Sequence, residues 1–507
     1  MNGRGVVSMD MKEGRALLEK VMEVRKSVIE EGDRLYGRWN RTPIRKAYEN
    51  SAQNLAHYMA FRKMDLRELQ ERLIPWGVSS LGRLEADVLG TLNALTKTLG
   101  SITGEDVGGI DYRSQASFRE RNEALRNNTD EIFGGNRHDR NERILVTMPA
   151  AAGSDYSLVE SLISSGMNMA RINCAHDDPE VWGGMIENIR EAEKKTGHTC
   201  RVLMDISGPK IRTKTLLTTK RNPKVKEGER FLISGQTSMT LPKGIELAVN
   251  TSVPEVLGKM KKGQVVKLDD GHIEAEVTET VDGGVICEVV RTVKENGVKV
   301  KTEKGINIPD VDYKLDVLTE QDYKDLDFAA GHADAIAFSF IKDKSDIDLI
   351  ETALRDRLTD ERRDLPAIAK IETTEGIRNL PEIIQQAAGA RPFGVMLARG
   401  DLAVETGYER LSEVQEELLW ICEAGHVPVI WATQVVESLV KTGIPTRSEI
   451  SDVVAGSRAE CIMLNKGDYI VDGVEVVSDI LKKFEVHQYK KTAMLRSLSI
   501  AEDAFKD

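Results

Sequence analysis

The stretch LPAIAKIETTEG, residues 365–376, ends an apolar run on two charged residues. Lys370 and Glu372 are two positions apart, and side chains two apart on a strand point to the same side. A buried charge is costly unless it is paired or has a use. An edge strand with a solvated lysine and glutamate is the structural alternative. If the strand is buried, we expect both charges to lie in one functional pocket.

Other apolar runs also end in polar residues that could take part in a reaction. These residues are Arg171 and Asn173, Asp205 with Lys210 and Arg212 shortly after it, Arg399, Gly400 and Asp401, and Thr433 with Gln434. Mg²⁺ prefers one or two carboxylates together with water and phosphate oxygens, and arginine and lysine stabilise a phosphoryl group during transfer. The set therefore predicts phosphoryl transfer assisted by Mg²⁺. Sugar-phosphate aldolases and isomerases gather similar residues and are the chemical alternative.

Short apolar or β-branched runs, alternating with helical patterns, would position these residues. The eight runs are 144–148, 168–173, 201–206, 335–340, 367–372, 394–400, 428–434 and 460–465. Strands that alternate with helices imply parallel β-α units. Eight such units predict an α/β fold, a (β/α)8 barrel of the TIM type, with functional groups at the carboxyl ends of the strands. A doubly wound open sheet is the structural alternative.

One long interval and the amino-terminal part of the chain do not follow this rhythm. Asp270-Gly271 and Asp282-Gly283 are hairpin signals within a valine-rich stretch. We expect a small β-barrel domain here, inserted after the third strand, where it can act as a lid. The expected division is a helical amino-terminal extension (1–140), a first barrel part (141–214), the inserted lid domain (215–310), and a second barrel part with terminal helices (311–507).

The amino-terminal extension contains apolar residues at helical spacing. The spacing is seen at Leu17, Val21, Val24 and Val28, and again at Leu84, Val88, Leu92, Leu95 and Leu99. These stripes predict core-facing helices. The highly charged stretch at 118–143, FRERNEALRNNTDEIFGGNRHDRNER, is instead expected to be a surface segment or a domain boundary, and not part of a core.

Composition and missing motifs exclude several other classes. The formal net charge of -12 argues against a general nucleic-acid or membrane surface. Five scattered cysteines without a C-x-x-C pair suit a reducing compartment, and the amino terminus lacks an apolar signal region, so we expect a cytoplasmic protein. The sequence contains neither a P-loop, nor a dinucleotide-binding glycine motif after a strand, nor the protein-kinase signatures, nor H-E-x-x-H.

From about residue 143 to 485, the order of motifs resembles the pyruvate kinase family. The motifs are MNMARINCAH, LMDISGPKIRT, KLDDGHI, KGINIPD, AIAKIETTEG, VMLARGDLAVE, WATQVVESLV and PTRSEISDV. The family fold is a (β/α)8 barrel with a small β lid domain after strand three. The resemblance implies transfer of a phosphoryl group from phosphoenolpyruvate to ADP, giving pyruvate and ATP in glycolysis, with Mg²⁺ or Mn²⁺. It also implies a homo-oligomer.

The resemblance assigns roles to individual residues. Lys370 corresponds to the lysine that steadies the phosphoryl group and the enolate, Arg171 to the phosphate-binding arginine, and Thr433 to the hydroxyl near the proton-delivery step. The residues implied at the metal are Glu372, Asp401, Asp205 and Asn173. The residues implied at the nucleotide phosphates and the substrate cradle are Asn173, His176, Arg212, Lys304, Gly400 and Asp401, with Asp269 and Asp270 on the lid.

Two departures from the family pattern concern a monovalent cation. Ala175 replaces a serine that helps to bind this cation in the family, and Lys210 occupies a position where members that need no potassium carry lysine. A lysine ammonium is a compact point charge. We therefore expect Lys210 to substitute for K⁺, and the enzyme not to require it.

Further departures keep other functions open. Thr373 and Ala403 replace a common asparagine and glycine, and the eighth strand ends in Asn465-Lys466 instead of Ser-Gly-Glu. The family's carboxyl-terminal effector domain has no counterpart, so we expect no activation by sugar phosphates through such a domain. A barrel enzyme of another enolpyruvate reaction and a catalytically weak regulatory paralogue are the alternative functions.

Overall fold

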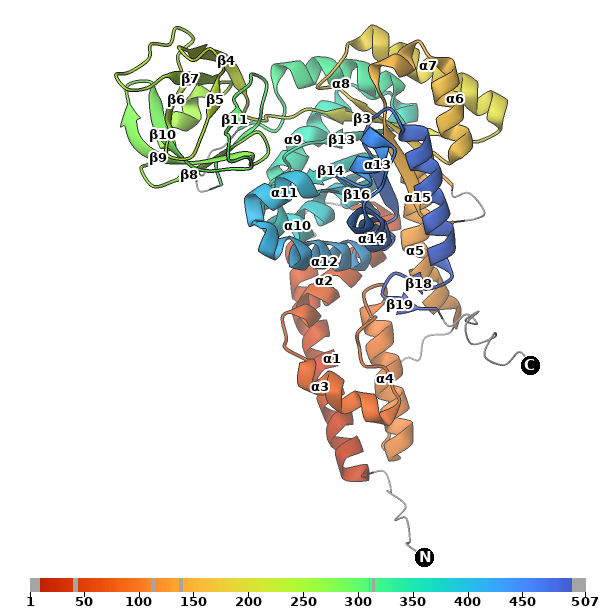
Figure 1. Cartoon of the computed structure of the whole chain (residues 1–507). Coiled ribbons are helices and arrows are strands. Elements are labelled where there is room, and N and C mark those ends of the chain that lie inside the picture. The colour runs from red at the N-terminus through yellow and green to blue at the C-terminus, as the bar shows by residue number, and fades with distance from the viewer. Residues whose placement is uncertain are drawn as a thin grey trace, which may run out of the picture.

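The barrel predicted from the eight apolar runs is present as a closed parallel sheet (Figure 1). The computed structural model describes residues 10–39, 44–110, 115–135, 140–309, 311 and 315–494. The strands follow one another around the barrel in the order β1-β17-β16-β15-β14-β13-β3-β2, and every neighbouring pair is parallel. Their bounds are β1 Arg143–Thr147, β2 Met169–Asn173, β3 Arg201–Ile206, β13 Ala335–Phe338, β14 Ala367–Ile371, β15 Phe393–Ala398, β16 Val429–Ala432 and β17 Cys461–Leu464. The closed order rules out the open sheet.

The barrel strands are apolar on both faces because both faces are buried. Inward-pointing side chains such as Leu145, Leu203 and Ile430 form one cluster inside the barrel. Outward-pointing side chains such as Ile144 and Val146 pack against the surrounding helices. Those helices are α6 Tyr156–Ser165, α7 Pro179–Thr196, α8 Glu320–His332, α9 Lys344–Arg355, α10 Thr374–Ala390, α12 Tyr408–Ala424, α14 Arg447–Gly456 and α15 Ile470–Glu485.

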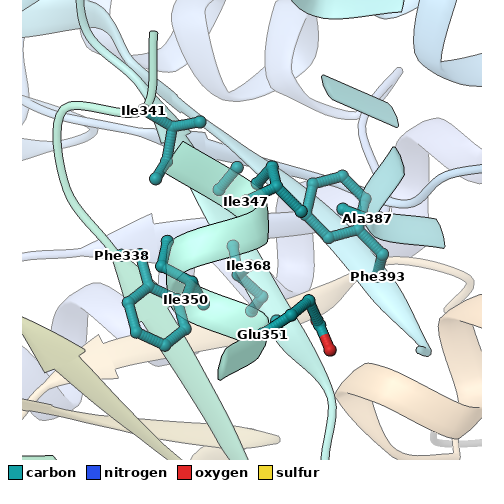
Figure 2. Close-up of a pocket in the computed structure, with 10 residues that line it drawn as sticks. Phe338, Ile341, Ile347, Ile350, Glu351, Ile368, Ala387 and Phe393 are labelled. Carbon is teal, nitrogen blue, oxygen red and sulfur yellow. The ribbon is translucent and has the colours of Figure 1, made fainter. Parts of the chain in front are cut away.

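Strands and helices pack closely where α9 and α10 meet the barrel. Figure 2 shows the contact of α9 and α10 with the strands, where Phe338, Ile347, Ile350 and Phe393 enclose a void of about 10 Å³. A void of this size is about the minimum that one water molecule needs. At its edge, Glu351 pairs with Arg391 at 2.5 Å, which satisfies a nearly buried guanidinium. The barrel wall is therefore a rigid scaffold for the loops above it.

The charged stretch that we expected at the surface instead contributes to the core, because the end of its helix closes the barrel where the strands begin. Helix α5, Gln115–Phe133, ends with Ile132 and Phe133, which are 1% and 0% exposed and belong to the cluster inside the barrel. The expectation failed because charged neighbours mask two apolar residues that fill the hole at the strand starts. After the plug, Gly134 adopts φ 86°, and its carbonyl accepts a hydrogen bond from Arg143 at 3.0 Å. Residues 136–139 of this stretch lie outside the described residues.

The lid domain is built mainly from one seven-stranded sheet, in the order β12-β8-β9-β10-β6-β7-β4, with a two-stranded sheet of β11 and β5. The strands are β4 Thr213–Thr218, β5 Lys224–Val225, β6 Arg230–Ser234, β7 Leu247–Thr251, β8 Val265–Leu268, β9 Ile273–Val281, β10 Gly284–Thr292, β11 Val298–Lys299 and β12 Ile306–Asn307. Both predicted hairpins form. Gly271 and Gly283 adopt φ of 82° and 70° in the turns, which glycine does without strain.

The amino-terminal helices form a stem that extends downward from the barrel in Figure 1, away from the lid, which lies at the upper left. Their bounds are α1 Met11–Trp39, α2 Glu49–Arg62, α3 Arg67–Leu73 and α4 Val88–Thr103. The predicted stripe from Leu17 to Val28 is buried in α1, whereas Leu84 is buried but precedes α4. Asn54 joins the stem to the barrel by donating to the carbonyls of Glu85 and Ala424 at 2.7 and 2.9 Å.

A short hairpin after α15 also connects the barrel to the stem. Its strands are β18 Gln488–Tyr489 and β19 Thr492–Ala493. Lys490 pairs with Glu460 of the barrel, and Lys491 pairs with Glu85 of the stem. None of the helices in the described part of the chain is long and apolar enough to cross a membrane.

Replacing Phe133 by alanine should destabilise the barrel strongly. The substitution leaves a cavity among side chains that cannot collapse, and such changes cost about 3–5 kcal/mol. Urea unfolding followed by circular dichroism measures the loss. Ile74→Ala, at a residue 62% exposed, is the control and should change stability by less than about 0.5 kcal/mol. Equal midpoints for the two variants would contradict the plug.

Candidate active site

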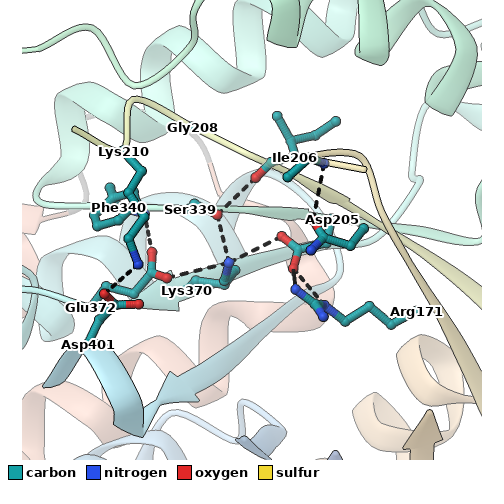
Figure 3. A network of polar contacts seen from close by, with 12 residues as sticks. Arg171, Asp205, Ile206, Gly208, Lys210, Ser339, Phe340, Lys370, Glu372 and Asp401 are labelled. Atoms are coloured by element: carbon teal, nitrogen blue, oxygen red, sulfur yellow. Dashed lines mark hydrogen bonds and ion pairs between the residues drawn. The ribbon is translucent and has the colours of Figure 1, made fainter. Parts of the chain in front are cut away.

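The carboxyl ends of the barrel strands bring six of the predicted residues into one chain of charges (Figure 3). Arg171 lies in β2, Asp205 in β3 and Lys370 in β14, and Glu372 directly follows β14. Lys210 follows β3 on the way to the lid, and Asp401 lies in the short helix α11, Arg399–Thr406. The sequence folds this way because parallel strands present all their carboxyl ends at the same rim.

Asp205 is the centre of the chain and is only 1% exposed. Its Oδ2 accepts from Arg171 Nε at 2.7 Å and Nη2 at 2.6 Å, and its Oδ1 is 3.3 Å from Lys370 Nζ. Burial alone would raise the pKa of Asp205, but the charges of Lys370 and Arg171 outweigh burial and hold the pKa below its ordinary value. The carboxylate thus stays ionised and fixes two cations at the rim.

Lys370 is held from three sides, and this explains the charge pair at the end of its strand. Its Nζ donates to Ser339 Oγ at 2.7 Å and lies 3.4 Å from Glu372 Oε1. Ser339 in turn donates to the carbonyl of Ile206 at 2.9 Å. Both members of the AKIE pattern therefore point into one pocket, and the reading as a solvated edge strand does not apply.

Glu372 and Asp401 form the acidic side of the site. Glu372 is 3% exposed, and its Oε2 accepts from the backbone N–H of Phe340 at 2.6 Å. Burial raises the pKa of Glu372, and the nearby Asp401 carboxylate adds to the rise against the opposing effect of Lys370. Lys210 donates to Asp401 at 2.8 Å, and this ion pair raises the pKa of Lys210 in spite of its burial.

These two carboxylates suit a hard divalent cation. Mg²⁺ is commonly held by one or two carboxylates plus substrate oxygens and water. A cation between Glu372 and Asp401 would also remove the repulsion that raises the pKa of Glu372. In the described part of the chain, no three His, Cys, Asp or Glu side chains form a ready-made metal cage. The donor set therefore fits a metal that also needs ligands from a substrate.

Thr433 stands at the next rim position in a strained conformation. Its φ of 74° is rare for a β-branched residue and marks a place where the surroundings enforce the backbone. Arg399 provides that enforcement, since it donates to the carbonyls of Ala432 and Thr433 at 2.7 and 2.6 Å and pairs with Asp452 at 2.5 Å. Gly400 packs directly below the Thr433 side chain.

A cavity of about 360 Å³ adjoins the charge chain on the side of β1 and β2. Arg171, Asn173, His176 and Lys466 are among the residues that line it. The pKa of His176 is lowered by burial and by the charge of Lys466, which favours a neutral imidazole. The amide oxygen of Asn173 accepts from the backbone N–H of Ala175 at 3.2 Å, so it also stabilises a local turn.

The predicted lid residues lie outside the charge chain. Lys304 pairs with Asp269 at 2.7 Å, and Arg212 donates to the carbonyl of Glu303 at 3.2 Å. Asp270 approaches the chain most closely, with its Oδ1 3.8 Å from Lys210 Nζ. The lid therefore contacts the site through Lys210, while Arg212 and Lys304 are held by neighbours on the lid itself.

The sequence-based selection missed two residues that hold the site together, Ser339 and Phe340, and gave no role to a third, Arg399. Ser339 fixes Lys370, the backbone N–H of Phe340 binds Glu372, and Arg399 holds Thr433. Ser339 and Phe340 end the fourth apolar run, so the rule about strand ends could have found them. Arg399 stands beside Gly400 in the motif, but no sequence signal indicates that it binds carbonyls of the next strand.

Replacing Glu372 by glutamine should change the pH dependence of stability. The folded pKa of Glu372 is raised, so its stabilising contribution is complete below the unfolded pKa and is lost as pH rises through the folded pKa. In buffer with EDTA, the melting temperature of Glu372→Gln relative to wild type should therefore rise between pH 4 and pH 8. We expect a change of at least about 2 °C. Glu382→Gln, at an exposed position of α10, should show none, and parallel curves for all three proteins would contradict the raised pKa.

Replacing Gly400 by alanine should disturb Thr433 specifically. A Cβ at residue 400 would lie 2.7 Å from Thr433 Cγ2 and 3.7 Å from Thr433 Oγ1. Such overpacking costs about 1–3 kcal/mol. The double variant Gly400→Ala with Thr433→Ser removes the clashing methyl group and should regain most of the loss in urea unfolding. A double variant as unstable as Gly400→Ala alone would contradict this contact.

Comparisons with known proteins agree with this arrangement. Residues 139–474 match the family model described as the pyruvate kinase barrel domain. A pyruvate kinase from Geobacillus stearothermophilus is 36% identical over 353 residues, which cover 68% of this chain and 57% of the relative. A pyruvate kinase from Thermotoga maritima is 30% identical over 71% of this chain and 73% of the relative.

A solved structure gives the same result for the fold. The crystal structure of a pyruvate kinase from Cryptosporidium parvum superposes with a TM-score of 0.61 and 28% identity, covering 70% of this chain and 72% of that one. The chain spans less than two thirds of several curated relatives, 57% for Geobacillus stearothermophilus and 60% for Bacillus licheniformis. With the matched barrel and the charge chain at its rim, the protein belongs to the pyruvate kinase family.

Proposed function

We propose that this chain is a phosphotransferase that moves the phosphoryl group of phosphoenolpyruvate to ADP and forms pyruvate and ATP. The observation that carries the proposal is the convergence of Arg171 and Lys370 on buried Asp205, directly beside the Glu372–Asp401 pair. Cations and a metal-binding carboxylate pair at one rim are what phosphoryl transfer requires. The reaction would place the enzyme in glycolysis. The five cysteines, all free and buried, suit the reducing cytoplasm.

The proposed roles follow from where the side chains point. Lys370 and Arg171 neutralise the phosphoryl oxygens, and Lys370 also stabilises the enolate that remains after transfer. Asp205 keeps both cations in place, because it binds each of them directly. Thr433 lies across the rim, next to Gly400, and is proposed to act near the carbon that is protonated to give pyruvate.

Glu372 and Asp401 are the proposed ligands of Mg²⁺ or Mn²⁺, with Asp205 and Asn173 near enough in the sheet to assist. Asn173 and Asp205 are register partners in neighbouring strands. When bound, the metal would neutralise negative charge on the transferring group. Glu372 keeps its orientation through the Phe340 N–H, whether or not the metal is present.

The nucleotide is proposed to bind in the cavity beside Arg171, with its phosphates toward the charge chain. Asn173 and His176 line this cavity, while Arg212 and Lys304 would reach the phosphates from the lid. Closure of the lid would exclude water, which competes with ADP as an acceptor. The homo-oligomer expected from the resemblance is part of this proposal and is independent of the chemistry.

Lys210 is proposed to make K⁺ unnecessary. Its ammonium lies 2.8 Å from Asp401 and 3.8 Å from Asp270, so it already places a positive charge beside the substrate site. Ala175, on the other side of the site, offers no hydroxyl for a monovalent cation. A covalently attached cation at this position needs no ion from solution.

Pyruvate formation from phosphoenolpyruvate and ADP with Mg²⁺ should be equally fast in buffers with and without K⁺. Lys370→Met should lower kcat by at least about 10³-fold, because the charge that stabilises the transfer is lost. Lys344→Met, at an exposed lysine of α9, should keep wild-type activity. A coupled lactate dehydrogenase assay measures all three proteins.

Two results would count against these proposals. Activity that appears only with K⁺ would leave the reaction intact and remove the role of Lys210. Folded protein that binds phosphoenolpyruvate but forms no pyruvate in either buffer would overturn the proposed function.

A further inference from the structure

A second cavity, of about 470 Å³, lies at the hinge between the barrel and the lid. Pro209, Lys210 and Ile211 border it on the segment that leaves the barrel, and Ile306 to Pro309 border it on the segment that returns. We call this cavity the hinge pocket. Arg171, Asp205, Lys370, Glu372 and Asp401 are not among its lining residues.

The hinge pocket has an apolar wall and a polar end. Ile308, Pro309, Val311 and Leu315 form the apolar wall. The polar end comes from the barrel: Lys342 and the start of α10, where Thr373 is the N-cap and Thr374 and Arg378 follow. Exposed N–H groups and the helix dipole at such a start favour an anion.

Asn307 adds an independent sign that a ligand belongs here. The residue is 7% exposed and lines the pocket, yet its Oδ1 has no hydrogen-bond partner in the described structure. A buried polar atom without a partner is unusual and costly. An occupant that donates a hydrogen bond, such as a hydroxyl, would satisfy it.

The two barrel cations of the pocket are available to an anion. Within the described residues, the Arg378 side chain makes neither an ion pair nor a hydrogen bond, and Lys342 Nζ reaches only the Leu315 carbonyl at 3.4 Å. Lys210 is engaged by Asp401. Glu375 and Glu405 also line the pocket and favour an occupant with donors beside its anionic group.

We propose that the hinge pocket binds a small organic phosphate that carries hydroxyl groups, and that its binding sets the angle of the lid. Arginine and lysine beside a helix start match a phosphate dianion, and Asn307 matches a hydroxyl. Such a ligand would bridge the barrel residues Lys342 and Arg378 to Asn307 of the lid. The binding step is independent of the proposed phosphoryl transfer.

The two segments of the hinge are paired, so that the effect of a bound ligand on one segment would be passed to the other and to the lid. Two backbone hydrogen bonds join these segments, both 2.8 Å long. The N–H of Ile306 donates to the carbonyl of Ile211, and the N–H of Thr213 donates to the carbonyl of Lys304. Farther out, Lys267 of the lid donates to the Val404 carbonyl of the barrel at 2.6 Å. Because the segments are paired, a ligand that holds Asn307 also holds the outgoing segment.

The test uses glycerol 2-phosphate and isopropyl phosphate, which has the same skeleton without the hydroxyls. Equilibrium dialysis of the full chain should show tighter binding of glycerol 2-phosphate. The double variant Lys342→Ala with Arg378→Ala should weaken its binding at least 10-fold, and Asn307→Ala should abolish the preference over isopropyl phosphate. Arg355→Ala, an exposed arginine of α9 outside the pocket, should stay within twofold of wild type.

Hydrogen exchange locates the binding without any need for turnover. Glycerol 2-phosphate should slow exchange in peptides that contain Ile211 and Ile306. Equal affinity in wild type and the Lys342/Arg378 variant, or protection confined to peptides with Arg171 and Lys370, would overturn the proposal. If the alanine variant fails to fold, Lys342→Gln with Arg378→Gln serves in its place. If the protein binds glycerol 2-phosphate as expected but forms no pyruvate, the result would count against the proposed function and not against ligand binding in the hinge pocket.

Discussion

The site depends on one buried carboxylate that holds two cations. Asp205 is almost wholly inaccessible, and both Arg171 and Lys370 bind it directly. Without this anion, two positive side chains would repel each other across the rim, and each buried charge would lack a partner. With it, both cations are fixed before a substrate arrives, and such preorganisation is the main electrostatic contribution to catalysis.

The barrel determines where this arrangement can occur. The charged residues lie at or just after the carboxyl ends of the strands: Asp205 and Lys370 are in the last two residues of β3 and β14, and Glu372 and Asp401 follow β14 and β15 by one and three positions. The strained backbone at Thr433 has the same origin, since Arg399 binds carbonyls across to the neighbouring strand. The favourable packing of the rigid barrel wall offsets the unfavourable free energy of the buried charges and the strained backbone at its rim.

Much of this could be predicted from the sequence, because it depends on local periodicity. The eight runs, the lid hairpins and the shared pocket of Lys370 and Glu372 follow from alternation, turn dipeptides and strand direction. Contacts between distant segments could not be predicted. The burial of Phe133, the bond from Ser339 to Lys370 and the pairing of Lys210 with Asp401 join residues that are far apart in the chain or hidden among charged neighbours. Periodicity and turn dipeptides report local structure, and they do not identify which side chains from distant segments come into contact.

The plug formed by α5 means that the barrel is not a self-contained unit of the sequence. The family model begins at residue 139, six positions after Phe133, yet Phe133 shares one cluster with inward residues of the strands. A fragment cut at that boundary would lack Ile132 and Phe133 and would leave the amino-terminal end of the barrel interior open. During ribosomal synthesis α5 is made before any barrel strand, and its apolar end is fully covered only after the last strand, β17, has been added. The amino-terminal helices are thus tied to the assembly of the barrel as well as to its finished form.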